Sequence, residues 1–112
     1  MLFLMKTHLE PAQLDLLHRQ LLKKGAEVNE QLVQLLNGER VSLEGVLAAR
    51  PGEQPAERLR RFLTLIDAKI QATRRDSGTG YGVCERCGAA LPFTDLQQVP
   101  WAERCRACAD EP

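Results

Sequence analysis

Aromatic residues and long apolar runs are both scarce in this sequence. The aromatic side chains are those of Phe3, Phe62, Tyr81, Phe93 and Trp101. A core with so few rings is small, so a compact module around positions 81–101 needs a covalent or metal crosslink. The apolar start, residues 1–5, is too short for a secretory signal or for a membrane helix of roughly 20 residues. We therefore expect neither export nor contact with a membrane.

An excess of one charge sign is also absent. The chain has 15 basic and 15 acidic side chains, and this zero net charge argues against direct binding to nucleic acid. The charges are nevertheless segregated, because residues 27–53 have a net charge of −3 and residues 54–76 a net charge of +3. Two antiparallel helices with these charges would attract each other.

The first predicted helix begins near Pro11, because proline is tolerated in the first helical turn. Apolar residues then recur at steps of three, four and seven, which predicts one buried face. They are Leu14, Leu17, Leu21, Val28, Leu32 and Leu35. His18 lies beside this stripe, and we interpret it as a hydrogen-bonded seam residue rather than a metal ligand. Asn37-Gly38 is a helix-stop signal.

Residues 37–54 are predicted to form the tip of a hairpin. Ser42 can cap a short helix that continues to Ala49, and Arg50-Pro51-Gly52 is typical of a turn. A long segment without secondary structure is uncommon in a compact domain, which favours this short helix. The alternative is that the first helix runs through Gly38 to Ala49.

The second predicted helix runs from about Pro55 to about Arg75. Its apolar residues follow in steps of four and three, which is the spacing of a coiled-coil seam. They are Leu59, Leu63, Ile66, Ile70 and Thr73. Only about three heptads fit, so we expect a short antiparallel hairpin; an amphipathic helix on a globular core is the alternative. Residues 77–80, with the sequence S-G-T-G, then form a joint.

Two cysteine pairs give the clearest chemical signal. Cys84 and Cys87 are two residues apart, as are Cys105 and Cys108, and seventeen residues lie between the pairs. This spacing is typical of four-thiolate zinc sites, which are closed and hold a fold together. We predict one structural zinc ion per chain, although an iron–sulfur or rubredoxin-like iron centre uses the same ligands. Without an export signal, such pairs indicate a reducing compartment, so the protein is predicted to be cytoplasmic.

The residues around the cysteines have two interpretations. Four thiolates and one divalent ion leave a formal charge of −2, which nearby arginines offset unless they hold phosphate instead. These arginines are Arg86, Arg104 and Arg106. The apolar residues of this segment are expected to form a small core, with an exposed Pro100-Trp101 partner anchor as the alternative. They are Tyr81, Leu91, Phe93, Val99 and Trp101.

No catalytic arrangement is recognisable, so we predict no enzymatic activity and no catalytic residue. A thioredoxin-type redox site needs one cysteine pair near a βαβ pattern, not two matched pairs. The predicted fold is mainly α: a coiled-coil-like antiparallel helical hairpin joined to a small four-cysteine zinc finger. Residues 1–10 are an N-terminal extension, residues 11–76 the hairpin with its tip at about 37–54, and residues 77–112 the finger.

A block of residues around the cysteines carries a family resemblance. The block is Gly80-Tyr81-Gly82-Val83-Cys84, Cys87-Gly88, Leu91-Pro92, Leu96, Val99-Pro100, Ala102, Cys105 and Cys108. It resembles the DksA/TraR family of bacterial four-cysteine zinc-finger proteins, whose best-known members insert a hairpin into the secondary channel of RNA polymerase. The resemblance implies a transcription regulator that binds polymerase through its hairpin. The alternative is a zinc-stabilised protein–protein interaction module with a different partner.

Three departures from the family pattern limit what the resemblance implies. The family's acidic tip motif, Asp-x-x-Asp-x-Ala, is absent between positions 37 and 55, where Glu44 is the best remaining candidate for partner contact. Asp95 stands where the family usually has arginine. The sequence ends four residues after Cys108, without the helix that contributes to ppGpp binding in longer members, so we expect no ppGpp response.

Overall fold

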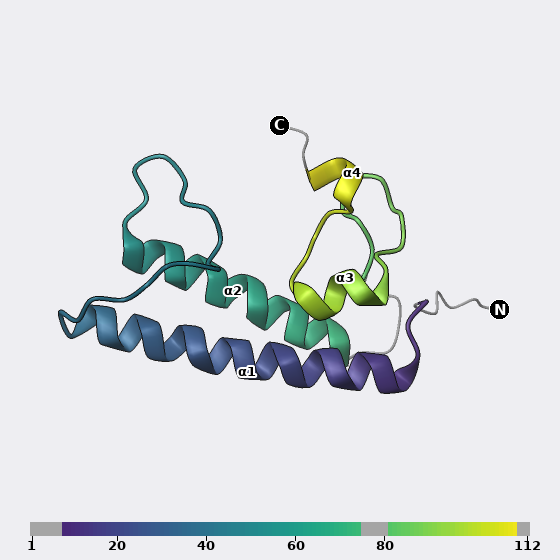
Figure 1. Ribbon diagram of the computed structural model, residues 1–112, viewed down its shortest axis with the longest axis horizontal. Coiled ribbons are helices and arrows are strands. Elements are labelled where there is room, and N and C mark those ends of the chain that lie inside the picture. The colour runs from purple at the N-terminus through teal and green to yellow at the C-terminus, as the bar shows by residue number, and fades with distance from the viewer. Residues whose placement is uncertain (1–7, 75–80, 110–112) are drawn as a thin grey trace.

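The fold is mainly helical, as predicted. The computed structural model describes residues 8–74 and 81–109, and the elements in these ranges are all helices. They are α1 (Pro11–Leu36), α2 (Pro55–Arg74), α3 (Phe93–Gln98) and α4 (Arg106–Ala109). The two long helices lie side by side and antiparallel, and the segment that contains α3 and α4 lies on one flank of this hairpin (Figure 1). Most of the predicted extension and the predicted joint at residues 77–80 lie outside the described residues.

The two ends of α1 are set by local sequence signals. Pro11 is the first helical residue, and the backbone N–H of Glu10 donates to Oε1 of Gln13 at 2.9 Å. At the other end, Gly38 has a φ of 86°, which favours glycine. This conformation lets the N–H groups of Gly38 and Glu39 donate to the carbonyls of Leu35 and Gln34, at 3.0 and 2.9 Å. The pair of bonds is the Schellman motif, so the helix stops where Asn37-Gly38 predicts.

The seam of the hairpin has one constant register. His18 Nδ1 lies 2.8 Å from Thr73 Oγ1, and a Cβ atom added to Gly25 would lie 3.5 Å from Cγ2 of Ile66. A step of seven residues forward along α1, from His18 to Gly25, therefore matches a step of seven residues back along α2, from Thr73 to Ile66. The fully buried residues of the two long helices, each at most 1% exposed, are Leu17, Leu21, Val28, Leu59, Phe62 and Ile66. In the described ranges, neither long helix has a window apolar enough to span a bilayer.

Phe62 is a core residue that the predicted stripe of the second helix omits. Its side chain is fully buried, whereas Leu63, which the stripe includes, is only half-buried. The reason is that α2 is covered on two sides, by α1 and by the finger. A seam pattern for two helices describes only the first of these contacts.

The 37–54 loop, which joins α1 to α2, contains no helix. The predicted short helix from Ser42 to Ala49 is therefore wrong, and so is the alternative that the first helix continues to Ala49. Gly45 has a φ of 82°, which a continuing right-handed helix cannot accommodate. The loop instead folds back along the hairpin, which brings Ser42 beside α1: Nε2 of Gln31 donates to the carbonyl of Ser42 at 3.2 Å.

Arginine side chains of α2 satisfy backbone carbonyls that a helix would have satisfied internally. Nε of Arg58 donates to the carbonyl of Leu47, and Nη2 of Arg61 donates to the carbonyl of Ala48 at 2.7 Å. Arg61 also forms an ion pair with Glu53 at 2.8 Å. The loop is thus an ordered structure without regular hydrogen bonding. Its apolar residues packed against the core are Leu43, Val46 and Leu47.

Candidate metal centre

The first cysteine pair lies on a tight turn. Val83 and Ala90 form an isolated antiparallel bridge, and the N–H of Cys84 donates to the carbonyl of Ala89 at 2.8 Å. Inside this turn, the N–H of Gly88 donates to the carbonyl of Cys84 at 2.9 Å. Gly88 has a φ of 78°, so glycine allows the chain to reverse beneath the two sulfur atoms.

The second cysteine pair lies at the start of α4. Cys105 directly precedes this helix, and its carbonyl accepts hydrogen bonds from the N–H groups of Cys108 and Ala109, at 3.1 and 2.8 Å. The two pairs are joined by the backbone, because the N–H of Glu85 donates to the carbonyl of Glu103 at 2.8 Å. Two turns from distant parts of the sequence thus face each other.

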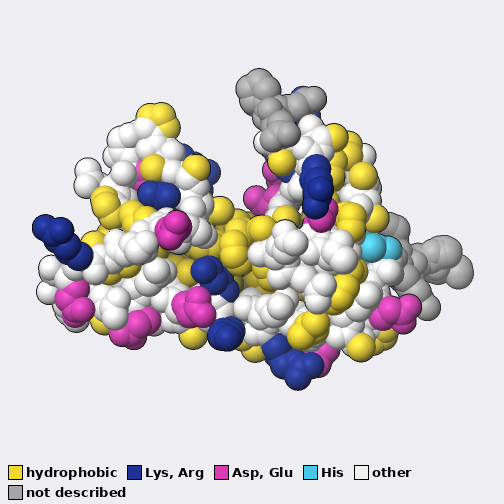
Figure 2. Space-filling view, in the orientation of Figure 1, with side chains coloured by type: hydrophobic (Ala, Val, Ile, Leu, Met, Phe, Trp, Pro, Cys, Tyr) yellow, Lys and Arg dark blue, Asp and Glu magenta, His cyan; other side chains and the backbone are white. Residues whose placement is uncertain are grey.

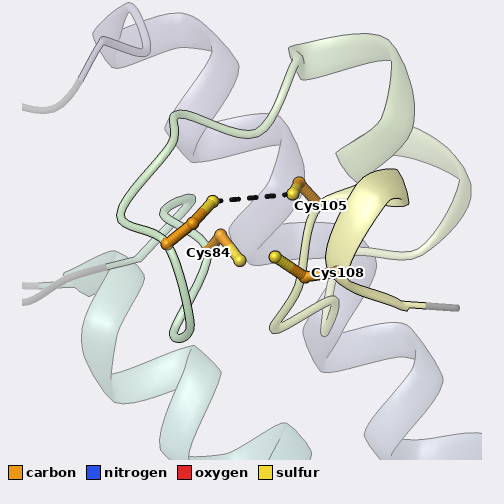
Figure 3. A group of neighbouring side chains, drawn as sticks. Cys84, Cys105 and Cys108 are labelled. Atoms are coloured by element: carbon orange, nitrogen blue, oxygen red, sulfur yellow. Dashed lines mark hydrogen bonds between the residues drawn. The ribbon is translucent and has the colours of Figure 1, made fainter. Parts of the chain in front are cut away.

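The four sulfur atoms form one cluster. Those of Cys84, Cys87, Cys105 and Cys108 all lie within 4.8 Å of one another, and Figure 3 shows three of these side chains pointing toward a common centre. A Zn–S bond of about 2.3 Å gives a tetrahedron with edges of about 3.8 Å. The distance between the sulfur atoms of Cys87 and Cys105 is 3.7 Å, which fits that edge. The four thiols can therefore hold one zinc ion, as predicted.

Local electrostatics shift the pKa values of the Cys84 and Cys108 thiols in opposite directions. Backbone N–H groups of Cys87 and Cys105 donate to the sulfur of Cys84 and lower the pKa of its thiol to about 6. Cys108 has a pKa raised to about 12, because its thiol hydrogen-bonds to the thiol of Cys105 and is desolvated. Four thiolates so close together repel one another, so their joint ionisation needs a cation. A divalent metal supplies that charge.

Two of the neighbouring arginines are paired with carboxylates of the finger. Arg104 lies 3.1 Å from Glu85, and Arg106 lies 2.9 Å from Asp95. The second pair involves Asp95, the residue that departs from the family pattern, and links a residue of α3 to a residue of α4 at the surface. Because each of these two arginines is paired with a carboxylate, the pairs favour neither the interpretation that they offset the charge of the thiolates nor the interpretation that they hold phosphate.

The core of the finger is smaller than the sequence predicts. Tyr81 and Leu91 are buried, together with Leu96, and the hydroxyl of Tyr81 donates to the carbonyl of Pro100 at 2.9 Å. Burial raises the pKa of this phenol. Val99 is 39% exposed and lies outside this core. Trp101 is half-buried, and its ring contacts the hairpin rather than the centre of the finger.

Glu44, the predicted partner-contact residue, is exposed in the 37–54 loop. Its N–H donates to the hydroxyl of Ser42 at 3.3 Å, in the part of the loop that folds back beside Gln31. Glu39, by contrast, follows the helix stop directly and lies at the end of the hairpin.

A cleft that the sequence did not indicate lies between the 37–54 loop and the finger. Its volume is about 480 Å³, and Leu47 of the loop, Leu65 of α2 and Trp101 of the finger contribute apolar surface. Figure 2 shows apolar side chains on its floor, between two raised lobes. The lining residues come from three separate segments, so no periodic pattern in the sequence identifies them.

Comparison with known proteins agrees with this geometry. Residues 80–111 match the family described as the prokaryotic dksA/traR C4-type zinc finger, which confirms the family resemblance. An uncharacterized protein of Aquifex aeolicus (strain VF5) is 40% identical over 48 residues, which are 43% of this chain and 32% of the relative. The chain thus matches about a third of that relative's length. No solved structure matches. These findings support a zinc finger of the DksA/TraR type at residues 80–111.

Proposed function

We propose that this chain, whose C-terminal segment matches the DksA/TraR zinc finger, is a non-enzymatic transcription regulator that binds bacterial RNA polymerase through its helical hairpin in the cytoplasm. One combination of observations supports this proposal. A family-type zinc finger at residues 80–111 lies against a hairpin formed by α1 and α2. Cys84, Cys87, Cys105 and Cys108 hold the zinc ion that keeps the finger folded.

Carboxylates near the end of the hairpin are the groups expected to act on the polymerase. Two exposed candidates are available, Glu44 in the folded-back part of the loop and Glu39 beside the helix stop. We keep Glu44 as the predicted contact, and the position of Glu39 makes it the competing candidate. The two are distinguishable by single substitutions, because neither side chain forms a hydrogen bond or ion pair with another residue of the described ranges.

The experiment measures binding of the zinc-loaded chain to purified core RNA polymerase. We expect saturable binding and competition with a known secondary-channel factor. Glu44→Ala should reduce the effect on initiation while leaving binding in place, whereas a loss seen only with Glu39→Ala would transfer the role to Glu39. Transcription should not change further when ppGpp is added. Deletion of residues 39–53 serves as the control for the whole loop.

A second function is supported by the cleft between the 37–54 loop and the finger. The lining of this cleft combines apolar side chains, such as Leu47, Leu65 and Trp101, with charged side chains of the finger, and the loop folds back rather than extending the hairpin. These features suit a protein–protein interaction module with a partner other than polymerase. Absence of binding to core polymerase, with the zinc finger and hairpin both folded, would favour this second function.

A further inference from the structure

A short segment of the finger reaches across both long helices. We call residues 99–104 the bridge segment, because they connect α3 to Cys105. The ring of Trp101 meets the ring of Phe62 on α2 edge to face, with centroids 5.0 Å apart and an interplanar angle of 71°. In addition, Nζ of Lys24 on α1 lies 5.7 Å from the centroid of the Trp101 ring. One side chain of the finger therefore touches both helices of the hairpin.

The bridge segment is held at both ends by the two cysteine turns. The carbonyl of Pro100 accepts the hydrogen bond from Tyr81, three residues before Cys84. The carbonyl of Glu103 accepts the N–H of Glu85, which lies inside the first cysteine turn. Cys105 itself follows the segment directly. Any change in the spacing of the two cysteine turns must therefore move the backbone that carries Trp101.

We propose that the bridge segment couples the metal site to the hairpin through the contact between Trp101 and Phe62. Zinc binding brings the two cysteine turns together and so orders Trp101 on the hairpin. Such coupling is reciprocal: the factor by which zinc favours the contact between Trp101 and Phe62 is also the factor by which that contact raises the affinity of the four cysteines for zinc. A peripheral ion pair between Lys69 and Glu103, at 3.6 Å, adds a second link between the segment and α2.

The hairpin has its own seam, so we expect α1 and α2 to stay paired when the bridge segment is released. Its buried residues on α1, such as Leu21 and Val28, pack against α2. Metal loss is thus expected to release Trp101 and uncover one side of Phe62, with α1 and α2 still paired. Because Trp101 also lines the cleft, the finger-side wall of the cleft would then depend on the metal.

The first test uses Trp101 as a probe, since it is the one tryptophan of the chain. Zinc is removed from the full chain with a chelator in the presence of a phosphine reductant, and tryptophan emission and far-ultraviolet circular dichroism are recorded. On zinc removal we expect a red shift of the tryptophan emission, with most of the helical circular dichroism signal retained. When zinc is added back, the emission should return to its original wavelength. Unchanged emission after complete zinc removal would overturn the proposal.

The second test measures zinc affinity by competition with a chromophoric chelator. Phe62→Ala is expected to weaken zinc binding by at least about fivefold, the lower end of typical coupling between sites. Val28→Ala removes an equally buried seam side chain of α1 and should change the affinity by no more than about twofold. Equal effects of the two substitutions, or none, would overturn the proposal.

Trp101→Leu repeats the affinity measurement without a cavity inside the hairpin, in case Phe62→Ala fails to fold. It should also weaken zinc binding by about fivefold or more. If zinc removal also abolishes the helical signal, the affinities of Trp101→Leu and Val28→Ala decide between coupling and general unfolding. None of these measurements involves RNA polymerase, so their outcome is independent of the proposed function.

Discussion

His18 on α1 is hydrogen-bonded to Thr73 on α2, with 2.8 Å between Nδ1 and Oγ1. The hydroxyl of Thr73 donates to the carbonyl of Ile70 at 2.8 Å, so its own hydrogen is already used. His18 must therefore carry the hydrogen on Nδ1 and be the donor. This assigns the tautomer and agrees with the interpretation of His18 as a seam residue.

Thr73→Val should destabilise the hairpin by about 1 kcal/mol, because the half-buried donor of His18 loses its acceptor. Thr64→Val is the matched control. Thr64 is exposed on the same helix and also donates to a preceding carbonyl, that of Arg60, but it accepts nothing from α1 in the described hydrogen bonds. Urea unfolding of the zinc-loaded proteins measures both changes, and equal losses would contradict the assigned bond.

Gly25→Ala should stabilise the protein by about 0.5–1 kcal/mol, because glycine is a poor residue for the interior of α1. The added Cβ would lie 3.5 Å from Ile66, which is ordinary van der Waals contact. Gly38→Ala has the opposite sign, since the φ of 86° at the helix stop is strained for alanine. Thermal unfolding of the pair tests this, and a loss of stability in Gly25→Ala would show that the helices are packed too tightly for a methyl group.

Ile66→Ala should cost about 2–5 kcal/mol, as expected for a large side chain at 1% exposure. Leu63→Ala should cost clearly less, because Leu63 is only half-buried. Chemical denaturation followed by circular dichroism gives both values. A larger loss for Leu63→Ala would mean that this side chain is covered by a second chain in solution.

Glu53→Gln should release the 37–54 loop from α2. The guanidinium of Arg61 and the N–H of Arg50 both bind the carboxylate and lower the pKa of Glu53 to about 2. Because the pKa of Glu53 is lower in the folded loop than in the unfolded chain, the charged carboxylate stabilises the loop at pH values above the ordinary pKa of about 4.5. This stabilisation is lost as the pH falls from about 4.5 toward 2. The protection factor of the Arg50 amide against hydrogen exchange, which corrects for the intrinsic pH dependence of exchange, should fall in that window, and in Glu53→Gln already at neutral pH. Glu39→Gln is the control, and similar exchange in both variants would contradict this account.

Metal analysis of protein purified without added metal should give about one zinc per chain. Cys87→Ser should lose that zinc, whereas Glu85→Gln, beside the ligands, should keep it. Cys87 is exposed while Cys84 is 2% exposed, so a chelator reaches the site from the side of Cys87. A fully folded, metal-free protein with four free thiols would contradict the zinc site, and one iron instead of zinc would reassign the metal.

Much of the fold follows from local patterns, because local forces decide it. The ends of α1 depend on Pro11 and Gly38, whose backbone preferences are intrinsic, and the cysteine turns depend on spacing and Gly88. The sequence could not predict the course of the 37–54 loop, since its carbonyls are satisfied by Arg58 and Arg61 from another element. It also could not predict that Phe62 is buried, because the finger covers it.

The constant register of the hairpin restricts how its length can change. A single inserted residue turns every later side chain of a helix by about 100°, so an insertion between His18 and Gly25 would allow only one of the pairs His18–Thr73 and Gly25–Ile66 to form. Only paired insertions of seven residues, one in each helix, keep the seam aligned, and each adds about 10 Å. The folded-back loop adds little to this distance. The distance from the zinc site to the end of the hairpin can therefore change only in steps of one heptad. Relatives with this seam should differ in hairpin length by whole heptads.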